Sequence, residues 1–301
     1  MKNLVFTLLH KAGITRLSAW RFRKRVIFLC YHGVTERASR SASDSKGLHV
    51  NAKRFARHLA FLQKHYHIIP FREFLRAREE NRRLPDNCAV LTFDDGFRNF
   101  LTVAAPMLAA RKIPATVFLI TGKAEESSNQ DLPAQWSPLD DERYLSWDEA
   151  RYLMNVQDIE FGSHTCSHPG LVMLSDADRR HELHHSHDEL VSQLKVEIPT
   201  LSYPKGQYSD LVADDARNVG YSCAVTTDRG QNELNHDLFS LGRTLIGDFD
   251  DEAAFAVRVS GLRWSLVRAL STFRSSHRTA QPLKSAPATE HYSGEIFEIP
   301  N

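Results

Sequence analysis

Two adjacent carboxylates are the residues of this sequence best placed to do chemistry. Asp94 and Asp95 lie in TFDDG, residues 92–96, directly after a short apolar segment. Neighbouring carboxylates repel each other and are costly to bury unless a positive group joins them, and a metal ion is an obvious candidate. Because successive residues point in different directions, the two Asp can hold different roles. Asp-Asp-Gly is also good turn chemistry, and the motif alone leaves that alternative open.

A histidine pair supplies further metal-ligand chemistry. His164 and His168 lie in HTCSH, residues 164–168, after a strand-like segment. Two histidines four apart share one face if the chain turns helically, and that spacing can present two imidazoles to one metal. The chain has fifteen histidines, so chance pairs are expected. Another pair, His181 and His185, lies in the polar segment HELHHSHDEL, which we interpret as a solvated helix face rather than a metal site.

A third motif, SYPKGQY at residues 202–208, also follows a strand-like segment. Pro and Gly shape a tight loop that can aim a backbone N–H into a pocket, although an ordinary strand-to-helix turn has the same composition. Taken together, the motifs offer one Asp and two His as ligands and a second Asp nearby. That donor set leaves coordination positions for water and substrate, as catalytic metal sites do.

The elements that must position these residues alternate between strand-like and helix-like segments. Apolar runs predict strands at 26–31, 67–69, 89–93, 115–120, 158–161, 200–203 and 221–226. Periodic segments predict helices at 55–65, 99–111, 147–154, about 175–195, 210–218 and about 251–270, the last capped by Asp250. Such alternation implies an α/β fold of parallel strands in a closed or nearly closed barrel, whose active site assembles at the strand ends. Residues 123–141 look like an irregular surface insertion.

Composition sets broad limits on function. Hydrophobic residues make up 42% and charged residues 25%, as in a soluble globular protein. A net charge of +1 gives no strong field to recruit nucleic acid. The cysteines are scattered and form no Cys-x-x-Cys pair, which favours reduced, individually buried thiols; they are Cys30, Cys88, Cys166 and Cys223.

On these motifs the sequence resembles the polysaccharide deacetylases with the NodB homology domain, carbohydrate esterase family 4. Residues 92–96 look like the first family motif, and residues 164–168 like the second, His-Ser/Thr-x-x-His. Residues 202–206 look like the third, usually Arg-x-Pro-x-Gly. The resemblance covers roughly residues 25–265 and implies a distorted (β/α) barrel of about seven parallel strands.

The resemblance also implies roles for individual residues. Asp94 matches the general base, and Asp95, His164 and His168 match the metal ligands, which usually hold Zn²⁺. The donor set would also accept Co²⁺, Ni²⁺ or Mn²⁺. The backbone N–H of Lys205 matches the group that helps to hold the oxyanion. The implied activity is metal-dependent hydrolysis of N-acetyl groups on amino sugars of a polysaccharide or glycolipid precursor.

Two positions depart from the family pattern. Ser202 stands where the third motif usually has an Arg that orients the base. We hypothesise that Arg243 replaces it from another strand end, with a surface salt bridge as the alternative role. The late family motif with its catalytic-acid histidine is missing, which leaves His236 and His32 as candidates for the acid.

Two other functions stay open on these residues. The same side chains could hydrolyse a small linear or cyclic amide, or the chain could be a carbohydrate-binding relative that has lost catalysis. The missing acid favours the binding protein slightly, whereas the complete set of base and metal ligands argues against it.

The chain divides into a helical extension at residues 1–24, a deacetylase domain at 25–271 and a flexible tail at 272–301. The apolar stretch 4–9 is short, which makes it a poor signal peptide and too short to span a bilayer. The basic run 21–25 leaves room for peripheral membrane contact. We therefore expect a cytoplasmic enzyme, with membrane association open, acting on an N-acetylated glycan or glycolipid and not on nucleic acid.

Overall fold

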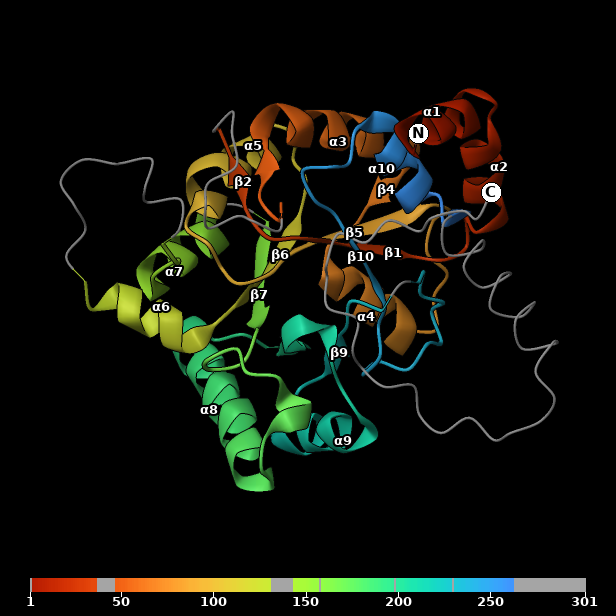
Figure 1. Cartoon of the computed structure of the whole chain (residues 1–301). Coiled ribbons are helices and arrows are strands. Elements are labelled where there is room, and N and C mark those ends of the chain that lie inside the picture. The colour runs from red at the N-terminus through yellow and green to blue at the C-terminus, as the bar shows by residue number, and fades with distance from the viewer. Residues whose placement is uncertain are drawn as a thin grey trace, which may run out of the picture.

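The central sheet of the chain curls into a nearly closed barrel of parallel strands (Figure 1). The computed structural model describes residues 2–36, 47–130, 143–156, 158–197, 199–228 and 230–262. The strand order is β10-β1-β5-β6-β7-β8-β9, and β4 pairs with the start of β5. A parallel bridge between Val225 and Leu241 links β9 to the segment before β10. The predicted barrel of about seven parallel strands is confirmed.

The barrel strands are short and mostly buried, as expected for parallel strands covered on both faces. Their bounds are β1 (Ile27–Tyr31), β4 (His67–Ile68), β5 (Cys88–Phe93), β6 (Ala115–Leu119), β7 (Ile159–Ser163), β8 (Thr200–Ser202), β9 (Cys223–Val225) and β10 (Arg243–Leu245). A separate parallel pair is formed by β2 (Val34–Thr35) and β3 (Val50–Asn51).

Helices cover the outside of the barrel and lead the chain from one strand to the next (Figure 1). They are α1 (Lys2–Lys11), α2 (Ile14–Arg21), α3 (Ala52–His65), α4 (Phe71–Glu79), α5 (Ala105–Ala109), α6 (Thr121–Ser128), α7 (Trp147–Val156), α8 (Asp176–Leu194), α9 (Asp210–Val219) and α10 (Glu252–Val259). Shorter helical turns are η1 (Phe100–Ala104), η3 (Leu171–Met173) and η4 (Pro204–Gly206).

Alternating side chains of the strands build separate cores. Ile27, Leu29 and Tyr31 of β1 join the large cluster beneath the outer helices. Phe28, between them, belongs to another cluster and packs on Phe71 of α4 with ring centroids 5.0 Å apart. This alternation follows from the two-residue period of a strand. One end of the barrel interior is therefore filled by aromatic rings.

Three predicted elements differ from the structure. The predicted helix 99–111 begins as the π-helical turn η1 before α5. The predicted insertion at 123–141 is helical up to residue 128, and its residues 131–141 lie outside the described part of the chain. The last predicted helix is described only to residue 262.

The cap of α10 is Asp251, not the predicted Asp250. The side chain of Asp251 accepts a hydrogen bond from the Ala254 N–H. Asp250 is buried and instead accepts from the Gly247 N–H and from Arg258. The Asp250 carboxylate therefore binds groups outside the start of α10 and does not cap the helix.

The N-terminal helices α1 and α2 occupy most of the predicted extension, and α1 packs along α10. The predicted tail 272–301 lies outside the described residues, so the domain boundaries stay a prediction. None of the helices that the structure describes has the length and apolar character needed to cross a bilayer.

Candidate active site

The carboxyl ends of the parallel strands bring the three motifs to one end of the barrel. His32 follows β1, Asp94 and Asp95 follow β5, and His164 follows β7. The loop that begins at Tyr203 follows β8. Since all these strands run in the same direction, the residues that follow them meet around one opening.

Asp94 forms a buried ion pair with Arg243. Arg243 Nη1 donates to Asp94 Oδ1 at 2.7 Å, and Nη2 donates to Oδ2 at 2.6 Å. Both side chains are almost completely buried. Burial alone would raise the pKa of Asp94, but the charges of Arg243 and His164 outweigh it and hold that pKa well below its usual range. The carboxylate therefore stays ionised throughout the neutral range.

Arg243 reaches this position from the start of β10, where it is paired in register with Phe28 of β1. Its Nη1 also donates to Thr92 Oγ1 at 3.0 Å, and its Nε donates to the Thr226 carbonyl oxygen at 3.2 Å. Burial would lower the pKa of Arg243, but the neighbouring Asp94 raises it. An arginine with no exposed surface is not the surface salt-bridge partner that the alternative required.

Ser202 completes the group around Asp94. Its hydroxyl donates to Asp94 Oδ2 at 3.2 Å and accepts from Arg243 Nη2 at 2.9 Å. The small side chain leaves the space that the guanidinium of Arg243 fills. The position of the usual family Arg thus borders the same carboxylate, with the positive charge supplied from a different strand.

Asp95, His164 and His168 form the second group. Their ligand atoms all lie within 4.8 Å of one another. Asp95 Oδ1 is 3.5 Å from His164 Nε2 and 3.7 Å from His168 Nε2. The Nδ1–H of His164 donates to the Ser202 carbonyl oxygen at 2.7 Å, because a carbonyl can only accept. This hydrogen bond fixes the tautomer that leaves Nε2 for a metal, so the donor set fits a divalent cation.

His168 is held in its neutral form, which metal ligation requires. Burial and the nearby charge of His164 lower the pKa of His168 to about 4. The two imidazole rings lie 4.6 Å apart at an interplanar angle of 67°. At neutral pH His168 therefore offers a neutral imidazole to an ion.

The chain does not turn helically at 164–168, which was the condition for the two histidines to share a helix face. The segment is a loop in which Thr165 has φ 67° and His168 has φ 63°, and Asp95 on the facing loop has φ 70°. Non-glycine residues rarely adopt this left-handed region, and such strain concentrates at functional sites. The ligands are brought together by loop conformation and not by helical spacing.

Glu182 of α8 holds this loop in place. Its carboxylate accepts from the N–H groups of Cys166 at 3.0 Å and Ser167 at 2.9 Å. It also accepts from Ser167 Oγ at 2.5 Å. Glu182 is 8% exposed, so it acts as a buried anchor between the ligands His164 and His168.

The interpretation of HELHHSHDEL as a solvated face is correct for only one side of α8. Glu182, Leu183 and Ser186 are buried, because this side of the helix packs under the histidine loop. Next to this side, three and seven residues after Glu182, His185 and Glu189 lie with Cys166 of the same loop in a group whose ligand atoms are within 4.8 Å. Leu183 and Leu190, seven residues apart, were the sequence signal for a buried side of this helix. Nothing in the sequence indicated that Glu182 binds the loop at 166–167.

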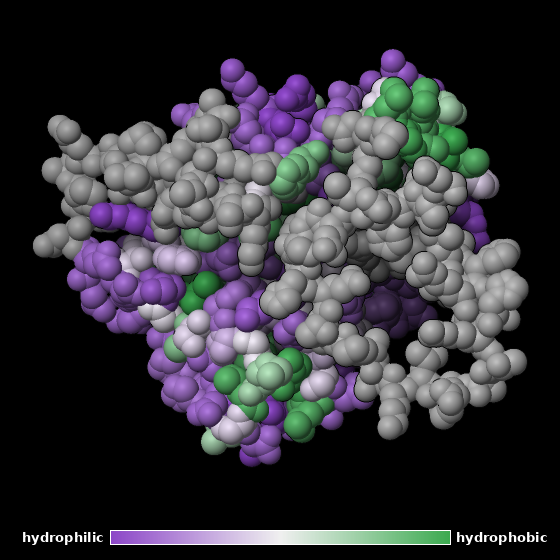
Figure 2. Space-filling view, viewed as in Figure 1, coloured by the Kyte–Doolittle hydropathy of each residue, from purple (hydrophilic) through white to green (hydrophobic). Residues whose placement is uncertain are grey.

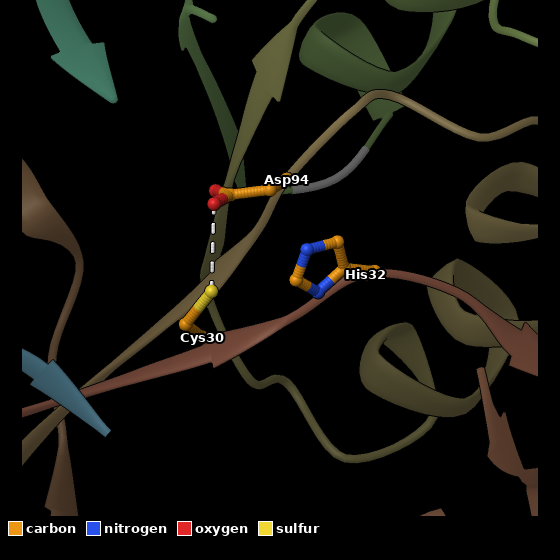
Figure 3. A group of neighbouring side chains, drawn as sticks. All are labelled: Cys30, His32 and Asp94. Atoms are coloured by element: carbon orange, nitrogen blue, oxygen red, sulfur yellow. Dashed lines mark hydrogen bonds between the residues drawn. The ribbon is translucent and has the colours of Figure 1, made fainter. Parts of the chain in front are cut away.

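His32 is the candidate acid that the fold places at the site. Figure 3 shows its ring beside Asp94 and Cys30, and the ligand atoms of the three lie within 4.8 Å. Within the described part of the chain, His32 Nδ1 is buried and has no hydrogen-bond partner. His236 is exposed, and its Nε2 lies 3.2 Å from the Ser240 carbonyl oxygen.

The loop after β8 has the tight turn expected for Lys205. Lys205 has φ 60° and Gly206 has φ 69°. A Cβ on Gly206 would lie 1.9 Å from Thr227 Oγ1, so only glycine fits. The Gly206 carbonyl oxygen accepts from Thr226 Oγ1 at 2.6 Å, which ties this turn to the strand beside Arg243.

Comparison with known proteins connects this geometry to a family. The family model described as "Polysaccharide deacetylase" matches residues 81–224. The poly-beta-1,6-N-acetyl-D-glucosamine N-deacetylase of Staphylococcus aureus is 24% identical over 217 residues, covering 69% of this chain and 71% of that protein. The protein of the same name from Escherichia coli is 21% identical over 261 residues, which cover 77% of this chain but only 38% of that protein.

A solved structure extends the similarity to the fold. The Streptococcus pyogenes deacetylase PplD, in complex with acetate, is 26% identical and superposes with a TM-score of 0.66. The alignment covers 78% of this chain and 98% of that chain. The match therefore includes nearly the whole of that deacetylase and most of the barrel described above.

Proposed function

We propose, from the premise that this chain belongs to the polysaccharide deacetylase family, that it hydrolyses N-acetyl groups on the amino sugars of a polysaccharide or glycolipid precursor. The observation that carries the proposal is the contrast between two adjacent aspartates. Asp94 is ionised and held by Arg243, and Asp95 faces the Nε2 atoms of His164 and His168. A base beside a metal-ligand set is what amide hydrolysis by water requires.

Asp95, His164 and His168 would hold the metal, and we assign Zn²⁺ first because one carboxylate and two imidazoles suit it. When bound, a divalent metal would polarise the amide carbonyl and make a water molecule more acidic. Asp94 takes the proton of the attacking water. Its depressed pKa makes it a weak base, so it depends on water that has been acidified in this way.

The oxyanion and the leaving amine need further groups from the chain. We assign the backbone N–H of Lys205, in the tight turn after β8, as a donor to the oxyanion. We assign His32 as the acid that protonates the leaving amine, because it stands at the same strand ends as Asp94. His236 lies exposed in a loop and is not used in this scheme.

The assignment of the acid is tested by His32→Asn with His236→Asn as the matched control. His32→Asn should lower kcat for acetate release by about 10² to 10⁴-fold with metal content unchanged. His236→Asn should leave kcat within about twofold, which is an order-of-magnitude allowance for a surface change. Equal effects of the two variants would remove His32 from the mechanism.

The activity itself is tested by acetate release from a panel of substrates, using metal-reconstituted wild type and Asp94→Asn. The names of the relatives suggest beginning with β-1,6-linked N-acetylglucosamine oligomers. N-acetylated glycolipids and small linear or cyclic amides complete the panel. Release from the sugars that collapses in Asp94→Asn, with metal retained, is the expected result.

Two other results would change the assignment. Turnover of small amides without turnover of sugars would make the chain an amide hydrolase that uses the same residues. Sugar binding without turnover, at one equivalent of metal, would make it a non-catalytic binding protein. The buried base and its dedicated arginine argue against that last function, because binding alone needs neither.

We also propose that the enzyme works in the cytoplasm, on a precursor. The support is that all four cysteines are free and three of them are buried. Cell fractionation with an antibody to the chain tests this placement, and recovery outside the cytoplasmic and inner-membrane fractions would contradict it.

A further inference from the structure

The outer face of α1 and α2 exposes large apolar side chains. Leu4 is 65% exposed, Leu8 59%, Leu17 65% and Trp20 59%, and Val5 beside them is 49% exposed. Figure 2 shows apolar side chains gathered at the upper right, where Figure 1 places these two helices. We call the five residues named above the N-terminal apolar face.

The burial pattern of α2 is the reverse of that of a helix packed for water. Its buried residues are Thr15 and Ser18, whereas Leu17 and Trp20 point outward. Ser18 Oγ donates to the Ser260 carbonyl oxygen at 2.9 Å, which fixes this orientation against the end of α10. An amphipathic helix in water turns its apolar side to the protein core. The orientation therefore leaves the apolar side for a different surface.

The charge of this region is strongly one-sided. Seven lysines and arginines precede the first acidic residue, Glu36: Lys2, Lys11, Arg16, Arg21, Arg23, Lys24 and Arg25. The whole chain carries a net charge of only +1, so positive charge is concentrated beside the N-terminal apolar face. Among the described side chains, Arg23 pairs with Asp86 and Arg25 pairs with Glu233.

We propose that the N-terminal apolar face docks on the surface of an anionic lipid bilayer. Apolar side chains that enter the acyl boundary, with basic residues at the headgroups, are the chemistry of interfacial helices. Trp20 suits this boundary because an indole ring has a large apolar body and a polar N–H. A protein partner or a second copy of this chain would explain the apolar side chains but would not require the excess of positive charge.

Docking at this face leaves the catalytic end of the barrel open. The Arg23 carbonyl oxygen, just after α2, accepts from the N–H of Asn87, which immediately precedes β5. The helices therefore join the barrel at the amino ends of its strands. Asp94 and Asp95 follow the carboxyl end of β5, at the opposite end. A docked molecule keeps its site accessible to a glycan away from the lipid surface.

The test is co-sedimentation of the full chain with vesicles. Vesicles of phosphatidylcholine alone are compared with vesicles that contain about 30% phosphatidylglycerol, a fraction chosen to give an anionic surface of the order found in cells. The wild type should bind the anionic vesicles at least about tenfold more tightly, and added salt should weaken that binding. Trp20 fluorescence should shift to shorter wavelength on binding, a shift that Trp20→Phe removes.

The test variant replaces four members of the face: Leu4→Ser, Leu8→Ser, Leu17→Ser and Trp20→Ser. Its vesicle affinity should fall at least about tenfold, since each change removes apolar area that docking on the bilayer would bury. Met173→Ser with Leu211→Ser is the matched control, because both side chains are exposed apolar residues elsewhere, at 84% and 52%. The control should bind as the wild type does. Circular dichroism of both variants checks that they are folded.

Three results would overturn the proposal. The first is equal binding of the wild type to neutral and anionic vesicles. The second is unchanged binding by the four-residue variant. The third is a dimer, seen in analytical ultracentrifugation, that forms through this face and excludes vesicles, which would make a second copy the occupant. None of these depends on the deacetylase assignment, because no catalytic activity is measured.

Discussion

Asp94 and Asp95 are neighbours in the chain but lie in two different environments. Asp94 points into the barrel, where Arg243, Ser202 and Cys30 surround it with hydrogen-bond donors. Asp95 lies on the rim, in the left-handed region, with its carboxylate facing His164 and His168. The interior aspartate is paired with a permanent cation of the protein, whereas Asp95 faces two imidazole rings, of which His168 is held neutral by a lowered pKa.

This difference assigns the two carboxylates to different work. A buried charge with its own arginine is stable without any added ion. A carboxylate that faces imidazole rings has no such fixed cation, and a bound metal ion would supply the balancing positive charge. The barrel interior therefore holds the base, and the loops after β5 and β7, which we call the rim, hold the metal ligands. Substitutions in the two regions should therefore impair the enzyme in different ways.

The largest expected effect comes from comparing Asp94→Asn with Asp95→Asn. Both should lower acetate release by about 10² to 10⁴-fold, because one removes the base and the other a metal ligand. Metal content measured by atomic absorption should stay near wild type in Asp94→Asn and fall in Asp95→Asn. Loss of metal in both variants would show that Asp94 also contributes to metal binding, so that the two aspartates do not have separate roles.

Arg243→Met should have the next largest effect. It leaves a buried carboxylate without its cation, which should cost about 3–5 kcal/mol of unfolding free energy in denaturant titrations. Burial then raises the pKa of Asp94, so the acidic limb of the pH–rate profile should move to higher pH. Arg243→Lys should restore part of the stability and of the limb. An acidic limb that stays in place would show that Arg243 does not set the charge state of the base.

Glu182→Gln tests the rim without touching a ligand. The carboxylate holds the loop between His164 and His168, and such supporting groups are worth about 10 to 100-fold in metal affinity. Competition with a metal-binding dye measures that affinity. Asp188→Asn, an exposed acid on the same helix, is the control and should change nothing. Equal affinity in the Glu182 variant would show that the strained loop holds itself.

The last expected effect, at His58, concerns stability alone and leaves catalysis at neutral pH unchanged. It is buried on α3, stacks on Phe255 at 4.0 Å, and has its pKa lowered by burial from 6.5 to about 4. His58 binds a proton more readily in the unfolded chain than in the folded one. The folded state therefore has its full stability above about pH 6.5 and loses part of it as the pH falls towards 4. The loss should reach about 3 kcal/mol.

His58→Gln should flatten this pH dependence of unfolding free energy while leaving catalysis at neutral pH near wild type. His184→Gln, an exposed change on α8, is the control and should keep the full slope. An unchanged slope in the His58 variant would assign the acid sensitivity to other groups, the rim histidines included.

The sequence by itself determined the barrel and the identity of the groups around its opening. Apolar runs of three to six residues, alternating with helical periods, bury both faces as parallel strands covered by helices. TFDDG and HTCSH follow two of those strands, so direction alone brings their side chains to one end. Local patterns record this information because strands, caps and turns depend on residues close together in the chain.

Only the tertiary structure decided how those groups are held. The sequence left Arg243 two roles, a partner of the base or a surface salt bridge; the structure decides for the first, because Arg243 reaches Asp94 across 149 residues of chain. In the sequence Glu182 is one polar residue among several histidines, and its role appears only from the packing of α8 beneath the loop. The left-handed conformations of Asp95 and His168, rather than helical spacing, bring the ligands together. Charges, hydrogen bonds and strain of this kind depend on distances in space, and folding sets those distances between segments that are remote in sequence.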